Sequence, residues 1–202
     1  MITYYGLSGH QALELIQPGW RVLELGGAVN PLLRADIQVD IQLPNNPQDK
    51  CGYLLRDVNE GLPFTDKSFD FVWCSHLLED IRDPIRVCSE IVRVGKAGYI
   101  AVPSREIESC FGIDDPKFCG FVHHRWLCEL IEDVLVFTFK SPYLLIVAEI
   151  YSISSDNLTF VWRDNFEFRE NFLLTKEEMK EDVWDFTFNR RFKNKKGVVK
   201  LL

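Results

Sequence analysis

The sequence has no long hydrophobic run, no excess of positive charge and no CxxC cysteine pair. No apolar stretch approaches the roughly 20 residues that a helix needs to cross a bilayer. Residues 1–9 also lack the basic and then apolar layout of a secretory signal. A net charge of −7 argues against a nucleic-acid partner, which selects a basic face. We therefore expect a cytoplasmic protein without membrane partners, and the basic cluster at 190–200 is interpreted as a solvated tail.

Six cysteines are spread along the chain without a disulfide or metal pattern. A chain of 202 residues without a signal peptide is not typical of a disulfide framework. The spacing of the cysteines and histidines in the middle of the chain matches no compact zinc-ligand motif: Cys110, Cys119, His123, His124 and Cys128. Four of the six cysteines lie in apolar or helical patterns that suit reduced, buried thiols, and the sequence predicts no metal.

Short apolar runs alternate with helical patterns over the first two thirds of the chain. Five runs bounded by Gly, Pro or Asp are typical of strands buried on both faces: 21–25, 37–39, 53–55, 69–73 and 99–102. Asp83 as cap, Pro84 as first residue and an apolar stripe through Ile85, Cys88 and Val92 predict a helix that ends at a glycine. A second helix is expected at 125–131 and a strand–turn–strand hairpin at 134–150.

These elements predict an α/β fold with a three-layer, doubly wound sheet. The sheet should be mostly parallel, with right-handed crossovers and a C-terminal antiparallel hairpin. We expect one domain at 1–150 and a small β-rich accessory extension at 151–202. In that extension, alternation at 157–168 suggests a hairpin, and Thr175 with Glu178 resembles the capping box of a helix at 176–184.

Polar residues and glycines gather where the predicted parallel strands end, which is where such sheets bind ligands. The loop at 24–31 carries two glycines, but Pro31 and the short spacing to the next strand exclude the dinucleotide fingerprint. Asp40 could accept hydrogen bonds from ribose hydroxyls, and Asp57 from an adenine amine. Either aspartate alone would more often be a loop or capping residue than a ligand, whereas together at successive strand ends they favour a nucleoside site.

Four stretches resemble motifs of class I S-adenosylmethionine-dependent methyltransferases. They are LELGGAVNP (23–31), DVNEGLPFTDKSFDFV (57–72), SHLLED (75–80) and EIVRVGKAGY (90–99). The resemblance covers roughly residues 20–150. It implies a seven-stranded sheet whose last hairpin is antiparallel, and S-adenosyl-L-methionine as cofactor.

The resemblance also implies roles for residues at the strand ends. Asp40 would hold the ribose, Asp57 with Val58 the adenine, and Cys74 and Ser75 would border the sulfonium. The full cofactor-binding set that it implies is Glu24, Gly26, Gly27, Ala28, Asn30, Asp40, Asp57, Val58, Cys74 and Ser75.

Methyl transfer from a sulfonium relies on positioning, with a general base needed only for a protonated nucleophile. Histidine suits that task near neutral pH, so His76, His123 and His124 are the candidate catalytic residues. Each could instead serve in packing or capping. The acceptor is expected to be a small molecule or a saccharide-like metabolite, and Arg105 is either a ligand for an anionic acceptor or a solvated loop residue.

Two other functions stay open at this point. Ala28 replaces a glycine of the cofactor loop, which would suit a non-catalytic binding module with the methyltransferase fold. A nicotinamide-dependent oxidoreductase is the third hypothesis, and the glycine spacing speaks against it. The sequence also leaves open whether the chain forms a homodimer.

Overall fold

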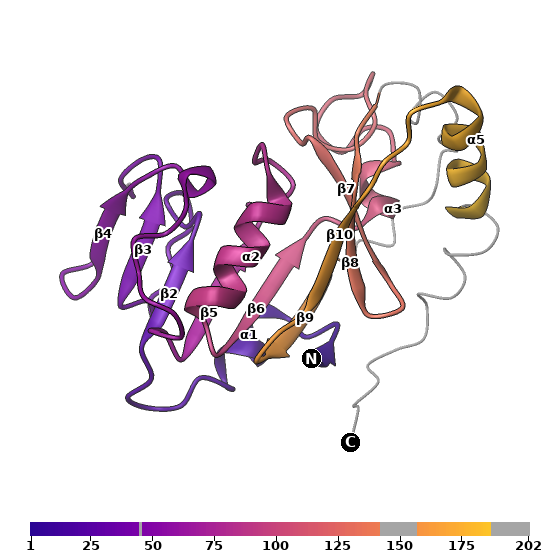
Figure 1. The fold of residues 1–202 in the computed structure, drawn as a ribbon. Helices are drawn as coiled ribbons and strands as arrows, with labels where there is room; N and C mark the ends of the chain where they lie inside the picture. Colours follow the sequence, from indigo (N-terminus) through magenta and orange to yellow (C-terminus); the bar gives the residue numbers. More distant parts are fainter. Residues whose placement is uncertain (45, 142–156, 187–202) are drawn as a thin grey trace.

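The computed structural model describes residues 1–44, 46–141 and 157–186 and is built on a seven-stranded mixed sheet. The strand order is β1-β9-β6-β5-β2-β3-β4 (Figure 1). In chain order, these strands are β1 (Ile2–Tyr5), β2 (Val22–Leu25), β3 (Ile37–Asp40), β4 (Gly52–Leu55), β5 (Phe71–Ser75), β6 (Ala97–Val102) and β9 (Leu158–Arg163).

The parallel part of the sheet confirms the five predicted strands. β2 to β6 pair in parallel with one another. The helix α2 (Pro84–Val94) joins β5 to β6 and lies across one face of the sheet (Figure 1). Asp83 caps it by accepting the backbone N–H of Arg86 at 2.9 Å, Pro84 opens it and Gly95 ends it, as predicted.

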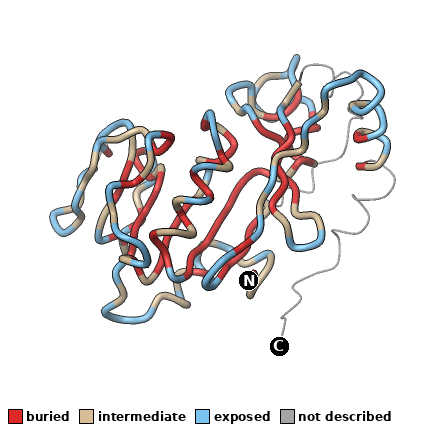
Figure 2. The backbone as a smooth tube through the Cα atoms, in the orientation of Figure 1, coloured by how far each residue is buried: buried red, intermediate tan, exposed pale blue. Residues whose placement is uncertain are grey.

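Each face of the sheet has its own core because the strand side chains alternate. Leu23, Val72 and Cys74 face the α2 side, whereas Val22 and Phe71 face the opposite side. Figure 2 shows the resulting buried track along the central strands. The second face is covered by loops and by the five-residue helix α1 (Gly9–Leu13). In the described part of the chain, no long helix follows β2 or β3.

The antiparallel strand of the main sheet comes from a later segment than predicted. β9 pairs antiparallel with β6 on one side and with β1 on the other. It lies beyond residue 150, so the main sheet takes strands from both sides of the expected domain boundary. The predicted hairpin at 134–150 does not supply this antiparallel strand. Its first half, Val134–Phe139, belongs to a second sheet, and its second half falls outside the described residues.

A second, three-stranded sheet lies at the end of the molecule away from β4 (Figure 1). It contains β7 (Trp126–Ile131), β8 (Val134–Phe139) and β10 (Glu167–Asn171). The predicted helix at 125–131 is therefore wrong, because β7 forms an antiparallel hairpin with β8. Glu132 and Asp133 make the two-residue turn with φ of 50° and 66°, the left-handed values of tight hairpin turns.

The alternating segment at 157–168 is also not a hairpin. β9 belongs to the main sheet, whereas β10 pairs in parallel with β8 in the second sheet. Asp164, at a φ of 64°, lies between them and redirects the chain. The segment therefore links the two sheets. The capping box of Thr175 and Glu178 is confirmed at the start of helix α5 (Lys176–Asp185), and the basic cluster at 190–200 lies outside the described residues.

A buried arginine joins α5 to the second sheet. Arg105, at the start of α3 (Arg105–Glu108), is 3% exposed and makes ion pairs with Glu129 at 2.7 Å and Asp182 at 2.6 Å. Its guanidinium also lies 4.5 Å above the Phe186 ring. The sequence suggested that Arg105 is either a solvated loop residue or a ligand for an anionic acceptor. Both interpretations are wrong, because the side chain is buried and its guanidinium is already paired with two carboxylates. Among the helices described, none has the length and apolar character that crossing a membrane requires.

The first prediction concerns this buried ion triad. Asp182→Ala should lower the free energy of unfolding by about 3 kcal/mol, because a buried charge loses one of its partners. Urea denaturation measures the change, and Glu181→Ala, on the exposed neighbouring position, is the matched control. A loss below about 1 kcal/mol, the range of exposed ion pairs, would contradict the structural role of the triad.

Candidate functional site

The order in which successive strands are added to the main sheet reverses between the neighbouring strands β2 and β5. From β2 the chain moves outward to β3 and β4, and then returns to β5 and continues to β6 on the other side. Ligands of open α/β sheets bind beyond the carboxyl ends of the strands at such a switch point. Gly26 follows β2, and Ser75 ends β5. The two loops that border the crevice are therefore those that sequence reasoning singled out.

The loop after β2 is built around the carboxylate of Glu24. Both carboxylate oxygens accept the backbone N–H of Leu32, at 2.9 and 3.0 Å. A Cβ added to Gly27 would lie 2.2 to 2.5 Å from the Glu24 carboxyl group. Gly26 has a φ of +79°, which favours glycine. The glycines thus let the loop fold tightly over Glu24.

A second carboxylate holds the same loop from β3. Asp40 ends β3, and its Oδ2 accepts the backbone N–H of Ala28 at 3.0 Å. Its Oδ1 accepts the N–H of Gln42 at 3.1 Å. A carboxylate offers about four lone-pair sites, so Asp40 retains acceptor capacity for hydroxyl groups. Ala28 itself is 3% exposed, and its methyl group is therefore buried.

Glu24 and Asp40 form an acidic pair inside this part of the site. Burial raises the pKa of Glu24 to about 7, the hydrogen bond from Leu32 opposes the rise, and the nearby Asp40 adds to it. At neutral pH Glu24 is therefore close to its titration midpoint. Such a pair favours hydrogen-bond donors and cations over anions as ligands.

The remaining residues of the predicted cofactor set lie in different surroundings. Asp57 caps the 3-10 turn η1 (Val58–Glu60), where its Oδ1 accepts from the backbone and side chain of Asn59 at 2.8 and 2.7 Å. These hydrogen bonds hold the pKa of Asp57 below its ordinary value. Val58 and Cys74 are core side chains, Ser75 is half-buried, and Asn30 is exposed.

His76 stands directly after β5. It has a φ of 53°, and its Nε2 lies 3.2 Å from Nδ2 of Asn157. Its Nδ1 lies 3.4 Å from Oε1 of the buried Glu79, and this carboxylate raises the pKa of the imidazole. His76 is half exposed, so it can exchange protons with solvent or with a bound molecule.

His123 and His124 converge on a different acid. The Nε2 atoms of His123 and His124 lie 3.9 and 3.8 Å from Oδ1 of Asp80. His124 is 6% exposed, and its Nδ1 lies 2.7 Å from Oε1 of Glu108, which is fully buried. Lys140 pairs with the other oxygen of Glu108. The structure thus gathers titratable groups from the β5 and β6 strand ends, the 121–125 turn and the end of β8.

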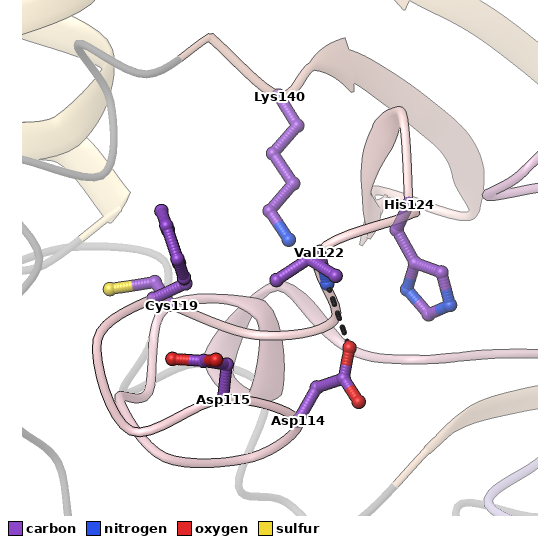
Figure 3. A pocket seen from close by; sticks show the side chains of 7 residues that line it. Asp114, Asp115, Cys119, Val122, His124 and Lys140 are labelled. Atoms are coloured by element: carbon purple, nitrogen blue, oxygen red, sulfur yellow. Dashed lines mark hydrogen bonds between the residues drawn. The ribbon is translucent and has the colours of Figure 1, made fainter.

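A pocket of about 510 Å³ opens beside His124. In Figure 3, Lys140 extends from the end of β8 toward the loop that carries Asp114 and Cys119, where Asp114 accepts the N–H of Val122 at 3.3 Å. Seven residues line the pocket: Asp114, Asp115, Phe118, Cys119, Val122, His124 and Lys140. The pocket therefore adjoins the histidine cluster rather than the loop after β2.

Comparison with known proteins gives one family. Residues 9–102 match the family model described as a methyltransferase domain. This segment contains β2 to β6 and the whole of the loop that Glu24 and Asp40 hold, and the match agrees with the resemblance seen in the sequence motifs. No curated protein matches the chain.

Solved structures of methyltransferases resemble parts of the chain. A SAM-dependent methyltransferase from Methanosarcina mazei is 15% identical over 80% of this chain and 99% of its own, with a TM-score of 0.45. One from Thermotoga maritima is 17% identical over 77% and 86%, with a TM-score of 0.44. A chain from a Haloferax volcanii complex of a methyltransferase with the Trm112 activator is 25% identical over 44% and 47%, with a TM-score of 0.36. The chain spans about half the length of the Haloferax volcanii chain and of two further methyltransferase structures, from Bacillus halodurans and Mesorhizobium loti.

Sequence reasoning missed Glu79, Asp80, Glu108 and Lys140 as members of one cluster. The available signal was that Glu79 and Asp80 follow the β5 strand end within a few residues, as ligand-side groups do in parallel sheets. Nothing in the sequence pointed to Lys140. Its position depends on the pairing of β8 with β7, and residues 125–131 were predicted to be a helix.

The second prediction uses the raised pKa of Glu24. A carboxyl group with a raised folded-state pKa contributes stability below its unfolded pKa of about 4.5, and this contribution is lost as the pH rises through about 7. Glu24→Gln should remove a pH dependence of order 2 to 3 kcal/mol over that interval. Denaturant unfolding from pH 4.5 to 8 measures it, with Glu14→Gln at an exposed position as control. Parallel stability curves for Glu24→Gln and the wild type would contradict the burial of this charge.

Proposed function

We propose that the protein transfers a methyl group from S-adenosyl-L-methionine to a small-molecule or saccharide-like acceptor. The observation that carries the proposal is that the methyltransferase-domain match over residues 9–102 coincides with the strands whose carboxyl ends form the switch-point crevice. The sequence motifs at 23–31 and 57–72 support the same assignment.

The residues present are compatible with a nucleoside ligand at the β2–β3 side of the crevice. Asp40 keeps unused acceptor sites for the two hydroxyls of a ribose, while its other lone pairs hold Ala28 and Gln42. Gly26 packs against Leu77 and Gly27 against Glu24, so neither position has room for a side chain and the loop stays tight beside the proposed ligand. Asp57 would contribute from the β4 side, with its capping role to Asn59 retained.

S-adenosyl-L-methionine, when bound, supplies an activated methyl group on a sulfonium. The chain would then orient the acceptor, exclude water and remove a proton if the nucleophile carries one. His76 is the preferred base, since it follows β5 and is half exposed, with Glu79 behind its Nδ1. The Nε2 atom would accept the proton, and the buried carboxylate would stabilise the resulting imidazolium. His123 and His124 are the alternative bases.

Ala28 is one reason to consider the non-catalytic alternative. Its side chain is buried, at 3% exposure. This burial counts against a pure binding module. Transfer of tritiated methyl to any member of a metabolite panel distinguishes the two functions directly.

The third prediction tests cofactor binding. Isothermal titration with S-adenosylhomocysteine should show one site, and Asp40→Asn should weaken binding about 10-fold through loss of a charged acceptor. Asp49→Asn, at an exposed position between β3 and β4, should leave the affinity unchanged. Absence of binding at high micromolar ligand would refute the proposed function.

The fourth prediction tests the base. His76→Asn keeps a residue that tolerates the left-handed backbone, and it should lower kcat about 100-fold with the best acceptor of the panel. Affinity for S-adenosylhomocysteine should stay within about twofold of the wild type, because His76 acts on the acceptor. The control is His10→Asn, at an exposed position on α1. An unchanged kcat would transfer the role to His123 or His124.

A further inference from the structure

We propose that Asp80, His123 and His124 bind a divalent transition-metal ion of the Zn²⁺ type. One ligand atom from each residue lies within 4.8 Å of the other two. The proposal does not depend on methyl transfer, because it rests on the geometry of these three side chains, and His76, the preferred base, is not one of them.

The backbone brings the two histidines to Asp80. The N–H groups of Arg125 and Trp126 donate to the carbonyl oxygen of Glu79, at 2.8 and 3.2 Å. This attaches the 123–125 segment to the residue that precedes Asp80. The N–H of His124 also donates to the carbonyl oxygen of Phe121 at 3.3 Å, which closes the turn. The approach of both imidazoles to one carboxylate is therefore fixed by the main chain.

The distances within the cluster suit metal ligands better than hydrogen bonds. The two Nε2–Oδ1 separations of 3.8 and 3.9 Å exceed the range of a hydrogen bond. The Oδ1 atom of Asp80 is buried and has no hydrogen-bond partner. Ligand atoms about 2.0 to 2.2 Å from a tetrahedral metal are roughly 3.3 to 3.6 Å apart. A small inward movement, which the 59%-exposed side chain of His123 can make, would complete the site.

Glu108 orients the buried histidine as a metal ligand. Its Oε1 lies 2.7 Å from Nδ1 of His124, a contact in which an Nδ1–H group would donate to the carboxylate. Nε2 is then the ring nitrogen that faces Asp80. Lys140 holds the second oxygen of Glu108 and donates to the carbonyl oxygen of Phe121 at 2.7 Å. A carboxylate behind a ligating imidazole is the usual arrangement at protein metal sites.

The local charge also favours a cation. Two carboxylates near Asp80, those of Glu79 and Glu108, are fully buried. Lys140 pairs with Glu108 and balances part of this negative charge. A divalent ion beside Oδ1 would offset this excess of negative charge.

The donor set defines the class of metal. Two imidazoles and one carboxylate suit Zn²⁺, Co²⁺, Ni²⁺ or Fe²⁺, whereas Mg²⁺ and Ca²⁺ prefer oxygen ligands alone. Three protein ligands leave a coordination position for water or a small molecule. His124 also lines the 510 Å³ pocket, so that position has a neighbouring cavity for a ligand.

Cobalt titration of the metal-free full-length protein tests the proposal. The wild type should bind one equivalent of Co²⁺ with visible d–d absorption, and Zn²⁺ should displace it. Asp80→Asn and His123→Asn should each weaken binding by about 10-fold or more, and Glu108→Gln by about 10-fold. His10→Asn, at an exposed position on α1, should bind as the wild type does.

Three results would overturn the assignment. The first is the absence of d–d bands on addition of Co²⁺. The second is d–d bands that appear with wild-type affinity in both Asp80→Asn and His123→Asn. The third is an intense thiolate-to-cobalt charge-transfer band, which would assign the ion to cysteine. His123 is exposed, so His123→Asn should keep the fold, and far-ultraviolet circular dichroism checks this for every variant. A weaker affinity in folded His123→Asn, with His10→Asn unchanged, supports the site.

Discussion

The loop that follows β2 depends on the buried carboxylate of Glu24. This group accepts the N–H of Leu32 with both oxygens, and it fills the space in which a side chain at residue 27 would stand. Asp40 ties the same loop to β3 through Ala28. Because these bonds shape the strand end at the switch point, the proposed nucleoside site is a consequence of internal hydrogen bonding. The cost of burying Glu24 appears as its raised pKa.

The other side of the crevice is also governed by carboxylates, of which Glu79 and Glu108 are fully buried. Glu79, Asp80 and Glu108 lie near His76, His123 and His124, and Lys140 compensates part of their charge. A buried carboxylate without a partner is costly, so this cluster is expected to recruit protons or a cation. Both proposed activities of this side, proton acceptance by His76 and metal binding by Asp80, follow from that excess of acid.

The sequence predicted the regular parallel core because local rules and tertiary structure agree there. The capped helix at Asp83 and Pro84 and the five apolar strands form as expected. The local sequence patterns failed where pairing between distant strands decides the structure. Residues 126–131 form a strand because β8 pairs with them. β9 and β10 do not form a hairpin, because β9 pairs in the main sheet and β10 in the second sheet. For the site, the strand-end position of Asp40 was predictable. The capping role of Asp57 depended on a turn that the spacing did not reveal, and Asp80 meets the histidines only through distant segments.

The most direct test of the central claim is a crystal structure with S-adenosylhomocysteine bound. The account predicts that the ribose hydroxyls lie within hydrogen-bond distance of Asp40, with the sulfur atom beside the end of β5 near Ser75. A ligand that lies instead in the pocket beside Lys140, or one that leaves Asp40 without contact, would contradict it.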